Sequence, residues 1–290
     1  MIREIQAKVL LAHIKQTETW FGLKYNMNLY RGCQHRCIYC DSRSACYQID
    51  GFDSEVLVKA NAVELLRKEL ASKRVKGPIG LGSMNDPYMP VEAVVNLTGR
   101  ALDVIAEFRF PVHVITKSDL VLKDLETLRR ISQVYASVSF TLTTADDELA
   151  AKVEPLAPRP SARLTAMRIL ADKGIQTGVT MMPILPFIED TVENITAIVE
   201  RAAAAGATYV LPSMGMTLRD RQRDYYFCQL DRHFPGLRER YERTYGGRHS
   251  CDVPNAGELS ALVEQLCARY GIATRLPLYS PQAAQQMQMF

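Results

Sequence analysis

Short apolar runs alternate with amphipathic stretches along most of the chain, and this alternation limits the fold more than any other feature. Runs typical of strands lie at residues 23–29, 55–59, 79–83, 111–116, 134–141, 175–182 and 207–211. Apolar residues at helical spacing occupy 61–71, about 93–107, 120–131, 161–173 and 191–205. This order predicts βα units, a mostly parallel sheet and right-handed crossovers. About six units are countable, so we expect an α/β fold: a partial (β/α)6 TIM-type barrel.

The pattern changes at both ends of this alternation. We expect an N-terminal extension at residues 1–22, the barrel at 23–215, and a helical C-terminal appendix at 216–290 packed on the barrel. Stretches rich in arginine and tyrosine at 219–233 and 237–245, and a terminal stretch at 258–270, predict its helices. Asn61, followed by Glu64, predicts a capping box at the start of the first barrel helix.

Composition narrows the class of protein. The 290 residues are 47% apolar and 23% charged, which is typical of a globular chain and excludes a disordered one. The net charge of +3 is too small to indicate a nucleic-acid partner. No apolar run approaches the about 18 residues of a membrane span, and the N-terminus lacks a signal-peptide pattern. We therefore expect a cytoplasmic protein that does not bind membranes.

Three of the seven cysteines lie within eight residues, in the stretch RGCQHRCIYCD. Cys33, Cys37 and Cys40 have the spacing C-x3-C-x2-C and follow the first predicted strand, at the end where β/α barrels carry their active sites. Cysteine thiolates hold iron–sulfur clusters, usually through four ligands. A cubane held by three leaves one iron free to chelate an amine and a carboxylate. The alternative is structural zinc, with His35 or a distant cysteine as the fourth ligand.

The stretch NLYRGCQHRCIYCDSR resembles the radical S-adenosylmethionine (SAM) superfamily, and more narrowly its spore photoproduct lyase-like (DNA repair photolyase-like) branch. The resemblance continues through SMNDPYMPVE, VITKSDLVLKDL, VSFTLTT, VEPLAPRPSARLTAMRILADKGI and MPILPFIED, over about residues 25–215. It implies a [4Fe–4S] cluster on Cys33, Cys37 and Cys40, with SAM bound at the open iron. Reductive cleavage of SAM would give a 5′-deoxyadenosyl radical that abstracts hydrogen from a substrate. The electron would come from a reductant such as flavodoxin or ferredoxin.

The resemblance also implies residues that contact SAM. An aromatic at Tyr39 would pack near the adenine, and Ser83, Asn85 and Asp86 would grip the methionine amine, although Asn-Asp-Pro is also a turn signal. Lys117, at a strand end, would pair with the SAM carboxylate unless it is a solvated loop lysine.

Other candidate residues have weaker signals. The Ser139 hydroxyl, if it faces the barrel interior, needs a partner, either SAM or another core group. Arg159 and Arg163 could clamp an acidic substrate. Met181 and Met182 could line the pocket, although core packing is the simpler interpretation. Cys251 could donate hydrogen, ligate a second cluster or do nothing, and Cys46, Cys228 and Cys267 show no second cluster spacing.

Two departures separate the chain from the lyase branch. Asp41 stands where the lyase has a tyrosine, and residues 78–90 contain no cysteine to act as its hydrogen donor. We therefore expect a radical SAM enzyme of unassigned substrate, with a DNA-repair lyase and a non-enzymatic iron–sulfur or zinc regulatory module as alternatives. A basic footprint for DNA would consist of Arg219, Arg221, Arg223, Arg238 and Arg240, but Asp220, Asp224 and Glu239 interleave with it.

Overall fold

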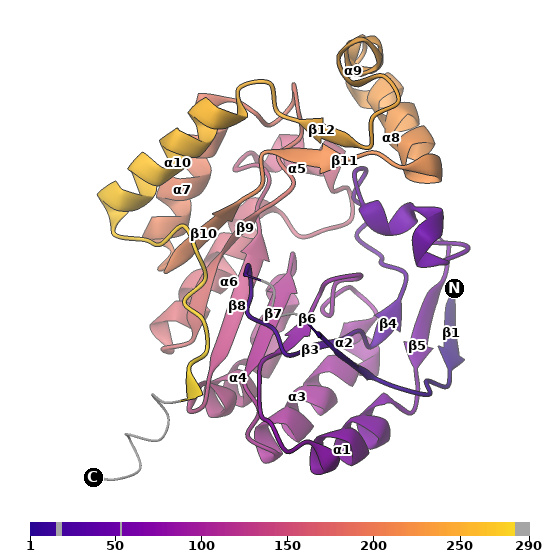
Figure 1. Ribbon diagram of the computed structural model, residues 1–290, viewed down its shortest axis with the longest axis vertical. Helices are drawn as coiled ribbons and strands as arrows, with labels where there is room; N and C mark the ends of the chain where they lie inside the picture. The colour runs from indigo at the N-terminus through magenta and orange to yellow at the C-terminus, as the bar shows by residue number, and fades with distance from the viewer. Residues whose placement is uncertain (16–18, 53, 282–290) are drawn as a thin grey trace.

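The computed structural model describes residues 1–15, 19–52 and 54–281 and centres on one twisted sheet (Figure 1). In this sheet the strand order is β10-β9-β8-β7-β6-β3-β2, with bounds Tyr209–Pro212, Gln176–Met181, Ala136–Thr141, Val112–Thr116, Ile79–Leu81, Tyr25–Met27 and Leu11–His13. Six strands run parallel, and β2 pairs antiparallel with β3 at the edge. The predicted partial barrel is confirmed, since the six parallel strands are those that the apolar runs indicated.

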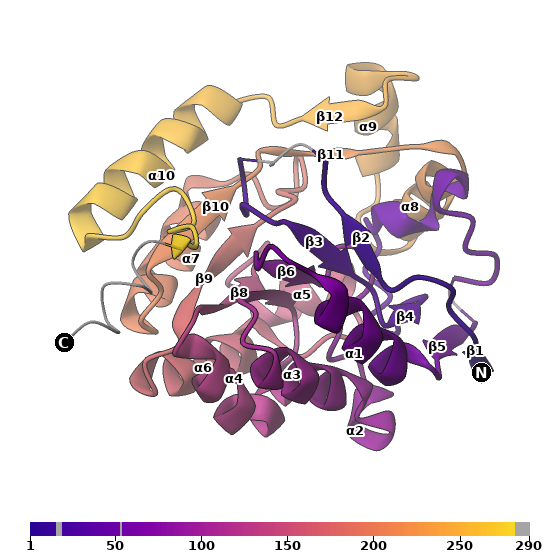
Figure 2. The same ribbon diagram turned by 60° about the horizontal axis from the view of Figure 1, so that its bottom comes forward.

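Helices cover the outer face of the sheet, as expected for βα units. They are α1 (Ala62–Ser72), α3 (Leu97–Glu107), α4 (Leu125–Ser132), α6 (Pro160–Asp172) and α7 (Val192–Ala204), and the first four lie along one side of the strands in Figure 2. Every residue of β8 is buried, which explains its nearly continuous run of small and apolar residues. No described helix combines the length and apolar character needed to cross a membrane.

Two predicted helices are broken at their starts. The stretch at 93–107 forms α2 (Glu92–Val95) and α3, separated by Asn96 in a left-handed conformation with φ of 50°. The buried Glu92 carboxylate accepts hydrogen bonds from the backbone N–H groups of Leu97 and Thr98, so it stabilises the second helix at its N-terminus. The stretch at 120–131 starts as a 3-10 helix, η3 (Asp119–Asp124), before α4 begins.

The capping-box prediction at α1 is wrong. Asn61 occupies the N-cap position, but its side chain makes no capping bond. Its amide instead pairs with the backbone of Ala7, donating to the carbonyl and accepting from the N–H, both at 2.9 Å. The Asn61 side chain therefore bonds to a residue 54 positions away instead of to its own helix. Helical periodicity in the sequence cannot reveal such a distant partner.

The N-terminal extension contributes strands to two sheets. β1 (Ile2–Ile5) pairs parallel with β5 (Val56–Lys59), and β5 pairs antiparallel with β4 (Tyr30–Arg31). The short apolar run at 55–59 therefore belongs to this small sheet and not to the barrel. Gly32 follows β4 with φ of +84°, and a Cβ there would lie 2.4 Å from the Glu55 carbonyl oxygen. Glycine is needed for the cysteine loop to start this close to β5.

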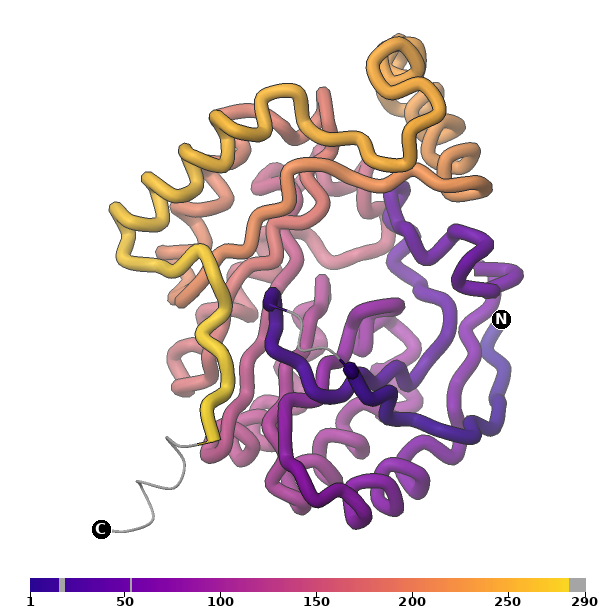
Figure 3. Tube along the Cα trace, in the orientation of Figure 1, coloured from indigo at the N-terminus to yellow at the C-terminus, as the bar shows by residue number. Residues whose placement is uncertain are grey.

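The C-terminal part returns to the barrel after an excursion over its top (Figure 3). β11 (Gly215–Thr217) and β12 (Ser250–Asp252) form an antiparallel pair, and α8 (Asp220–His233) and α9 (Leu237–Tyr245) lie between them. α10 (Ala256–Tyr270) packs against α7, after which Ala273 exchanges hydrogen bonds with β10. The three predicted C-terminal helices are present, whereas the boundaries at residues 22 and 215 stay a prediction.

Candidate active site

The cysteine loop lies over a small cavity at the C-terminal ends of β6, β7 and β8. Cys33, Cys37 and Cys40 together line this cavity of about 140 Å³, opposite residues 82–86 and 115–117. The loop is held in place by the segment after α5 (Asp147–Val153), because the Ile38 N–H donates to the Val153 carbonyl and the Leu156 N–H donates to the His35 carbonyl. The structure therefore brings the three predicted metal ligands together.

The chemistry of these three thiols fits an iron–sulfur cluster. Burial, and then the charges of Asp86 and the neighbouring thiol of Cys40, raise the pKa of Cys33 to about 12. Burial likewise raises the pKa of Cys37. The thiols of Cys33 and Cys37 are therefore unfavourable to ionise without a cationic group beside them, and iron in a cluster supplies one. Among the described residues, no set of three His, Cys, Asp or Glu side chains is arranged to hold a single metal ion.

His35 lines the same small cavity as the three cysteines. Its Nε2 lies 3.1 Å from Asp86 Oδ2, and its Nδ1 lies 3.4 Å from the Leu156 carbonyl oxygen. The Nδ1 nitrogen therefore faces a protein oxygen, whereas the buried Nε2 makes no hydrogen bond despite its closeness to Asp86. Zinc with His35 as the fourth ligand stays the alternative to the cluster.

Asp86 connects the loop after β6 to the end of β7 through hydrogen bonds. Its carboxylate accepts hydrogen bonds from Thr116 Oγ1 at 2.7 Å, from the Lys117 N–H at 2.6 Å and from the Tyr88 N–H at 2.8 Å. Burial alone would raise the pKa of Asp86, but His35 and these donors outweigh it and bring the pKa down to about 2. The bond from the Tyr88 N–H to the Asp86 side chain explains the turn signal of Asn-Asp-Pro. Asp86 also lines the cysteine cavity.

Asn85 and Ser83 differ in how freely they face the cavities. Asn85 donates from Nδ2 to the Tyr30 carbonyl at 2.7 Å, which ties the loop to β4. Ser83 exchanges hydrogen bonds with the Asn26 side chain and lines the cysteine cavity together with a larger neighbour. Of the Ser83, Asn85 and Asp86 set, the Ser83 hydroxyl is therefore the group with most freedom to meet a ligand.

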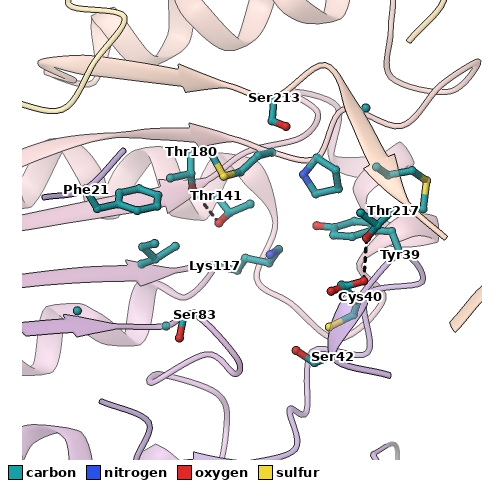
Figure 4. A pocket seen from close by; sticks show the side chains of 18 of the residues that line it. Phe21, Tyr39, Cys40, Ser42, Ser83, Lys117, Thr141, Thr180, Ser213 and Thr217 are labelled. Atoms are coloured by element: carbon teal, nitrogen blue, oxygen red, sulfur yellow. Dashed lines mark hydrogen bonds between the residues drawn. The ribbon is translucent and has the colours of Figure 1, made fainter. Parts of the chain in front are cut away.

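A larger cavity of about 580 Å³ adjoins the cysteine cavity within the barrel (Figure 4). The two share seven lining residues, which are Cys40, Ser42, Gly82, Ser83, Ile115, Lys117 and Thr141. Gly82 has φ of +101°, and a Cβ there would lie 2.1 Å from the Ile115 carbonyl oxygen, so the wall between β6 and β7 requires glycine. Tyr39 and Lys117, for which the resemblance implies contacts with SAM, both line this larger space.

A buried ionic network holds Tyr39 and Lys117. The Tyr39 hydroxyl donates to Glu154, Arg163 donates to Glu154 Oε2 at 2.5 Å, and the Lys117 ammonium lies 3.8 Å from Glu154 Oε1. Burial would raise the pKa of Glu154, but Arg163 and Lys117 outweigh it and lower the pKa, so the carboxylate is ionised. The Lys117 ammonium also lies 5.6 Å from the centroid of the Tyr39 ring.

This network corrects the interpretation of Arg163 and adds a residue that the sequence analysis missed. Arg163 is buried, and it also donates to the carbonyls of Pro158 and Thr141, so it cannot clamp a substrate. Arg159 is the N-cap residue of α6 and is not among the cavity-lining residues. Glu154 has no cysteine or motif neighbour to mark it. Its signal is one acidic residue in an otherwise apolar VEPLAP stretch.

Ser139 and Cys251 lie away from the cavity surface. The Ser139 hydroxyl lies 2.7 Å from His113 Nε2 and 2.6 Å from the Tyr209 hydroxyl, so it has protein partners inside the barrel. On β12, the flanking residues of Cys251 line the large cavity, whereas Cys251 packs in an apolar cluster with Tyr226, Tyr241 and other residues. Alternation along the strand therefore turns this thiol away from the site. Burial raises the pKa of Cys251 to about 11.

The two methionines divide as the strand pattern dictates. Met181 is fully buried in the core on β9, and the next residue, Met182, lines the large cavity. Core packing therefore describes Met181, and lining of the pocket describes Met182.

The arginines of the candidate basic footprint for DNA make their contacts within this chain. Arg219 pairs with Asp41, Arg221 donates to the carbonyls of Arg43 and Ile49, Arg223 donates to those of Gly246 and Arg248, Arg238 pairs with Asp231 and Glu242, and Arg240 stacks on Phe187. Two carboxylates, Asp41 and Asp252, line the large cavity on this side.

Comparisons with known proteins agree with this geometry. The model of the Radical SAM superfamily matches residues 27–202. An uncharacterized protein of Mycobacterium bovis is 34% identical over 257 residues, which cover 86% of this chain and 75% of that protein. A Radical SAM Nalpha-GlyT isomerase of Pseudomonas phage M6 is 27% identical over 219 residues, which cover 70% of this chain and 45% of the phage protein.

Solved structures give the same fold. A spore photoproduct lyase mutant with bound AdoMet and dinucleoside spore photoproduct superposes with a TM-score of 0.69 at 15% identity, covering 94% of this chain and 81% of the lyase. At this identity the likeness speaks for the fold alone. With the cysteine loop, the parallel barrel and the matched residues taken together, the chain belongs to the radical SAM superfamily.

Proposed function

We propose that this chain is a radical SAM enzyme in which Cys33, Cys37 and Cys40 hold a [4Fe–4S] cluster and SAM occupies the adjoining part of the large cavity. When bound, the cluster and SAM supply a reductively generated 5′-deoxyadenosyl radical that abstracts hydrogen from a substrate. The observation that carries the proposal is the joint wall of the two cavities: the three thiols line one, and Cys40 and six further residues line both.

The residues around the cavities would bind and orient SAM. Lys117 reaches the cavity with its ammonium held beside Glu154, so a carboxylate group would meet a fixed positive charge there. The Ser83 hydroxyl, next to the cysteine cavity, can accept a hydrogen bond from an ammonium group, and Asn85 and Asp86 hold its loop. The Tyr39 ring, fixed by its bond to Glu154, offers a flat apolar surface for the adenine. Ser139 and Cys251 do not enter the proposal because neither lines the cavity.

The rest of the large cavity would hold the substrate and exclude water. Phe21, Leu23, Ile115, Met182 and Met216 give it apolar surface against which a substrate can pack, between polar lining residues. The substrate class stays open. A DNA-repair reaction like that of the lyases is the alternative, and the internally bound arginines and the Asp41 and Asp252 carboxylates argue against a polyanion at this entrance.

The test is reconstitution with iron and sulfide under anaerobic conditions, followed by addition of SAM and dithionite. We expect a brown protein that forms 5′-deoxyadenosine, and we expect single Cys33→Ala, Cys37→Ala and Cys40→Ala variants to lose this product. Cys228→Ala, at an exposed cysteine on α8, is the matched control and should retain it. A colourless wild-type protein with stoichiometric zinc would overturn the proposal.

A further inference from the structure

A separate cavity lies between the N-terminal extension and β4, the strand that leads into the cysteine loop. Its volume of about 490 Å³ is within the range of small-molecule sites. Its walls include residues 5–9, both residues of β4, and Lys59 at the end of β5. Among the described lining residues, it shares Met84 and Asn85 with the cysteine cavity and none with the large cavity. A ligand bound there would therefore contact a loop of the cysteine cavity without entering the SAM site.

Three cations and no carboxylate line this cavity, which we call the basic cavity. Lys8, Arg31 and Lys59 contribute to its walls, and none of its described lining residues is Asp or Glu. Carboxylates do line the large cavity and the cysteine cavity. In the described part of the chain, none of the three cations lies within ion-pair distance of a carboxylate. The basic cavity therefore concentrates positive charge that no direct ion pair neutralises.

Arg31 and Lys59 keep hydrogen-bond donors for a ligand after their bonds to the backbone. Arg31 Nη2 donates to the carbonyls of Tyr47 and Gln48, at 3.2 and 2.8 Å. Lys59 Nζ donates to the Asn28 carbonyl at 2.6 Å. These bonds occupy only part of the donors that a guanidinium and an ammonium group carry. The backbone thus fixes where both cations lie, and their other donors remain for an acceptor in the cavity.

The closeness of these two cations costs free energy in the folded chain. Burial lowers the pKa of Lys59, and the positive charge of Arg31 lowers it further, while Glu69 acts in the opposite direction. The Glu69 carboxylate is bonded elsewhere, because it accepts from the N–H groups of Leu10 and Leu11 at 2.9 and 2.8 Å. An anion held between Arg31 and Lys59 would replace their repulsion by attraction.

We infer that the basic cavity is a binding site for a small organic phosphate, such as a phosphate monoester. A phosphate monoester carries close to two negative charges at neutral pH, so it offsets more of the positive charge than one carboxylate does. The guanidinium fork of Arg31 can hold two phosphate oxygens, while Lys59 and Lys8 act as point charges. Ile49 and Met84 line the same cavity and offer apolar surface to the organic part of the ligand. The inference does not rest on the proposed function, because this cavity lies outside the proposed SAM site.

Isothermal titration calorimetry of the reconstituted protein with phenyl phosphate, at constant ionic strength, tests the inference. Phenol is the uncharged counterpart of this probe, and a short single-stranded DNA distinguishes a small phosphate from nucleic acid. Lys59→Met removes a charge but keeps the apolar stem, and Lys8→Gln removes an exposed charge with little risk to the fold. Lys68→Gln, at an exposed lysine of α1 outside the cavity, is the matched control for net charge.

We expect wild type to bind one phenyl phosphate and to show no measurable binding of phenol. Lys59→Met should weaken binding at least about tenfold, as the loss of a charge-assisted hydrogen bond typically does. Lys8→Gln should weaken it about threefold, because water screens an exposed charge. Lys68→Gln should bind as wild type does, and saturating SAM should not displace the probe.

The inference is wrong if phenyl phosphate does not bind, if phenol binds as tightly, or if DNA alone binds. It is also wrong if Lys68→Gln loses as much affinity as Lys59→Met, or if neither Lys59→Met nor Lys8→Gln loses any. Displacement of the probe by SAM would place it in the large cavity instead. Failure of the proposed function has a different signature, because dithionite and SAM would then give no 5′-deoxyadenosine whether or not phenyl phosphate binds.

Discussion

Arginine–carboxylate pairs hold together both the barrel and the C-terminal helices, but in opposite surroundings. In the barrel, Arg163 and Glu154 expose 1% of their side chains each and meet at 2.5 Å. Between α8 and α9, Arg238 and Asp231 expose 44% and 48% and meet at 2.9 Å. Removing one partner of a buried ion pair is costly, because the remaining charge is neither paired nor solvated. Removing one partner of an exposed pair costs little, because water solvates the remaining charge. An arginine–carboxylate pair therefore positions cavity-lining residues in the barrel, whereas a pair of the same kind lies on the surface of the C-terminal helices.

The largest expected effect follows directly from this contrast. Glu154→Gln leaves Arg163 and Lys117 buried without their shared carboxylate, and we expect a loss of about 3–5 kcal/mol in the free energy of unfolding. The matched control Asp231→Asn breaks the exposed pair with Arg238 and should cost less than about 1 kcal/mol. Urea unfolding at neutral pH measures both. Equal losses from the two variants would show that burial does not separate the two regions.

A second buried carboxyl in the barrel predicts a pH dependence. Burial raises the pKa of Glu189 to about 8, against hydrogen bonds from Thr143 and the Leu185 N–H that lower it. Between pH 4.5 and 8 the unfolded chain has released this proton while the folded chain keeps it, so this contribution to stability falls as pH rises and levels off above 8. Glu189→Gln keeps the shape of the side chain but has no ionisable group, so its stability relative to wild type should increase over this window by on the order of 5 kcal/mol.

Unfolding free energies of wild type and Glu189→Gln from pH 5 to 9 test the pH prediction. Glu242→Gln, at a carboxylate of α9 paired with Arg238, is the control from the other region and should follow wild type at every pH. A difference between Glu189→Gln and wild type that is independent of pH would contradict the assignment of the proton to Glu189.

The sequence predicted those parts of the site whose signal is local. Cys33, Cys37 and Cys40 lie within eight residues, and the strand before them has its own apolar pattern, so spacing and periodicity were enough to predict that the three thiols meet at one place, and they line one cavity. Glu154 carries no such signal, because one of its partners, Tyr39, is 115 positions away. The six parallel strands were predictable for the same reason as the cysteine loop. The break before α3 was not, because it involves the buried Glu92 carboxylate, which is contacted by Lys123, 31 positions away, as well as by the Leu97 N–H.

The environments of two candidate features, Cys251 and the arginines of α8 and α9, were hidden from the sequence for related physical reasons. Cys251 is adjacent to residues that line the cavity, but the phase of β12 decides which side chains face it, and that strand has no apolar run to reveal its phase. The arginines of α8 and α9 look like a phosphate-binding set in the sequence, yet several of their partners are backbone carbonyls, such as those that accept from Arg221 and Arg223. Backbone acceptors are present at every residue, so a sequence cannot show which ones a guanidinium group meets.

Two glycines, one in the barrel and one in a C-terminal helix, predict the smallest differences in stability between the two regions. Gly178 lies on β9, and a Cβ there would meet the Tyr209 ring at 2.4 Å, while the Tyr209 hydroxyl bonds to Ser137 and Ser139 across the barrel. Gly178→Ala must displace the ring, so we expect a loss of about 1–3 kcal/mol. Gly257 lies on α10 with no atom within 4 Å of its Cβ position, so Gly257→Ala should raise helix propensity and gain up to about 1 kcal/mol. Thermal unfolding of the two variants should therefore shift in opposite directions, and a shift of the same sign in both would mean that the barrel interior yields to a methyl group as readily as the surface of α10.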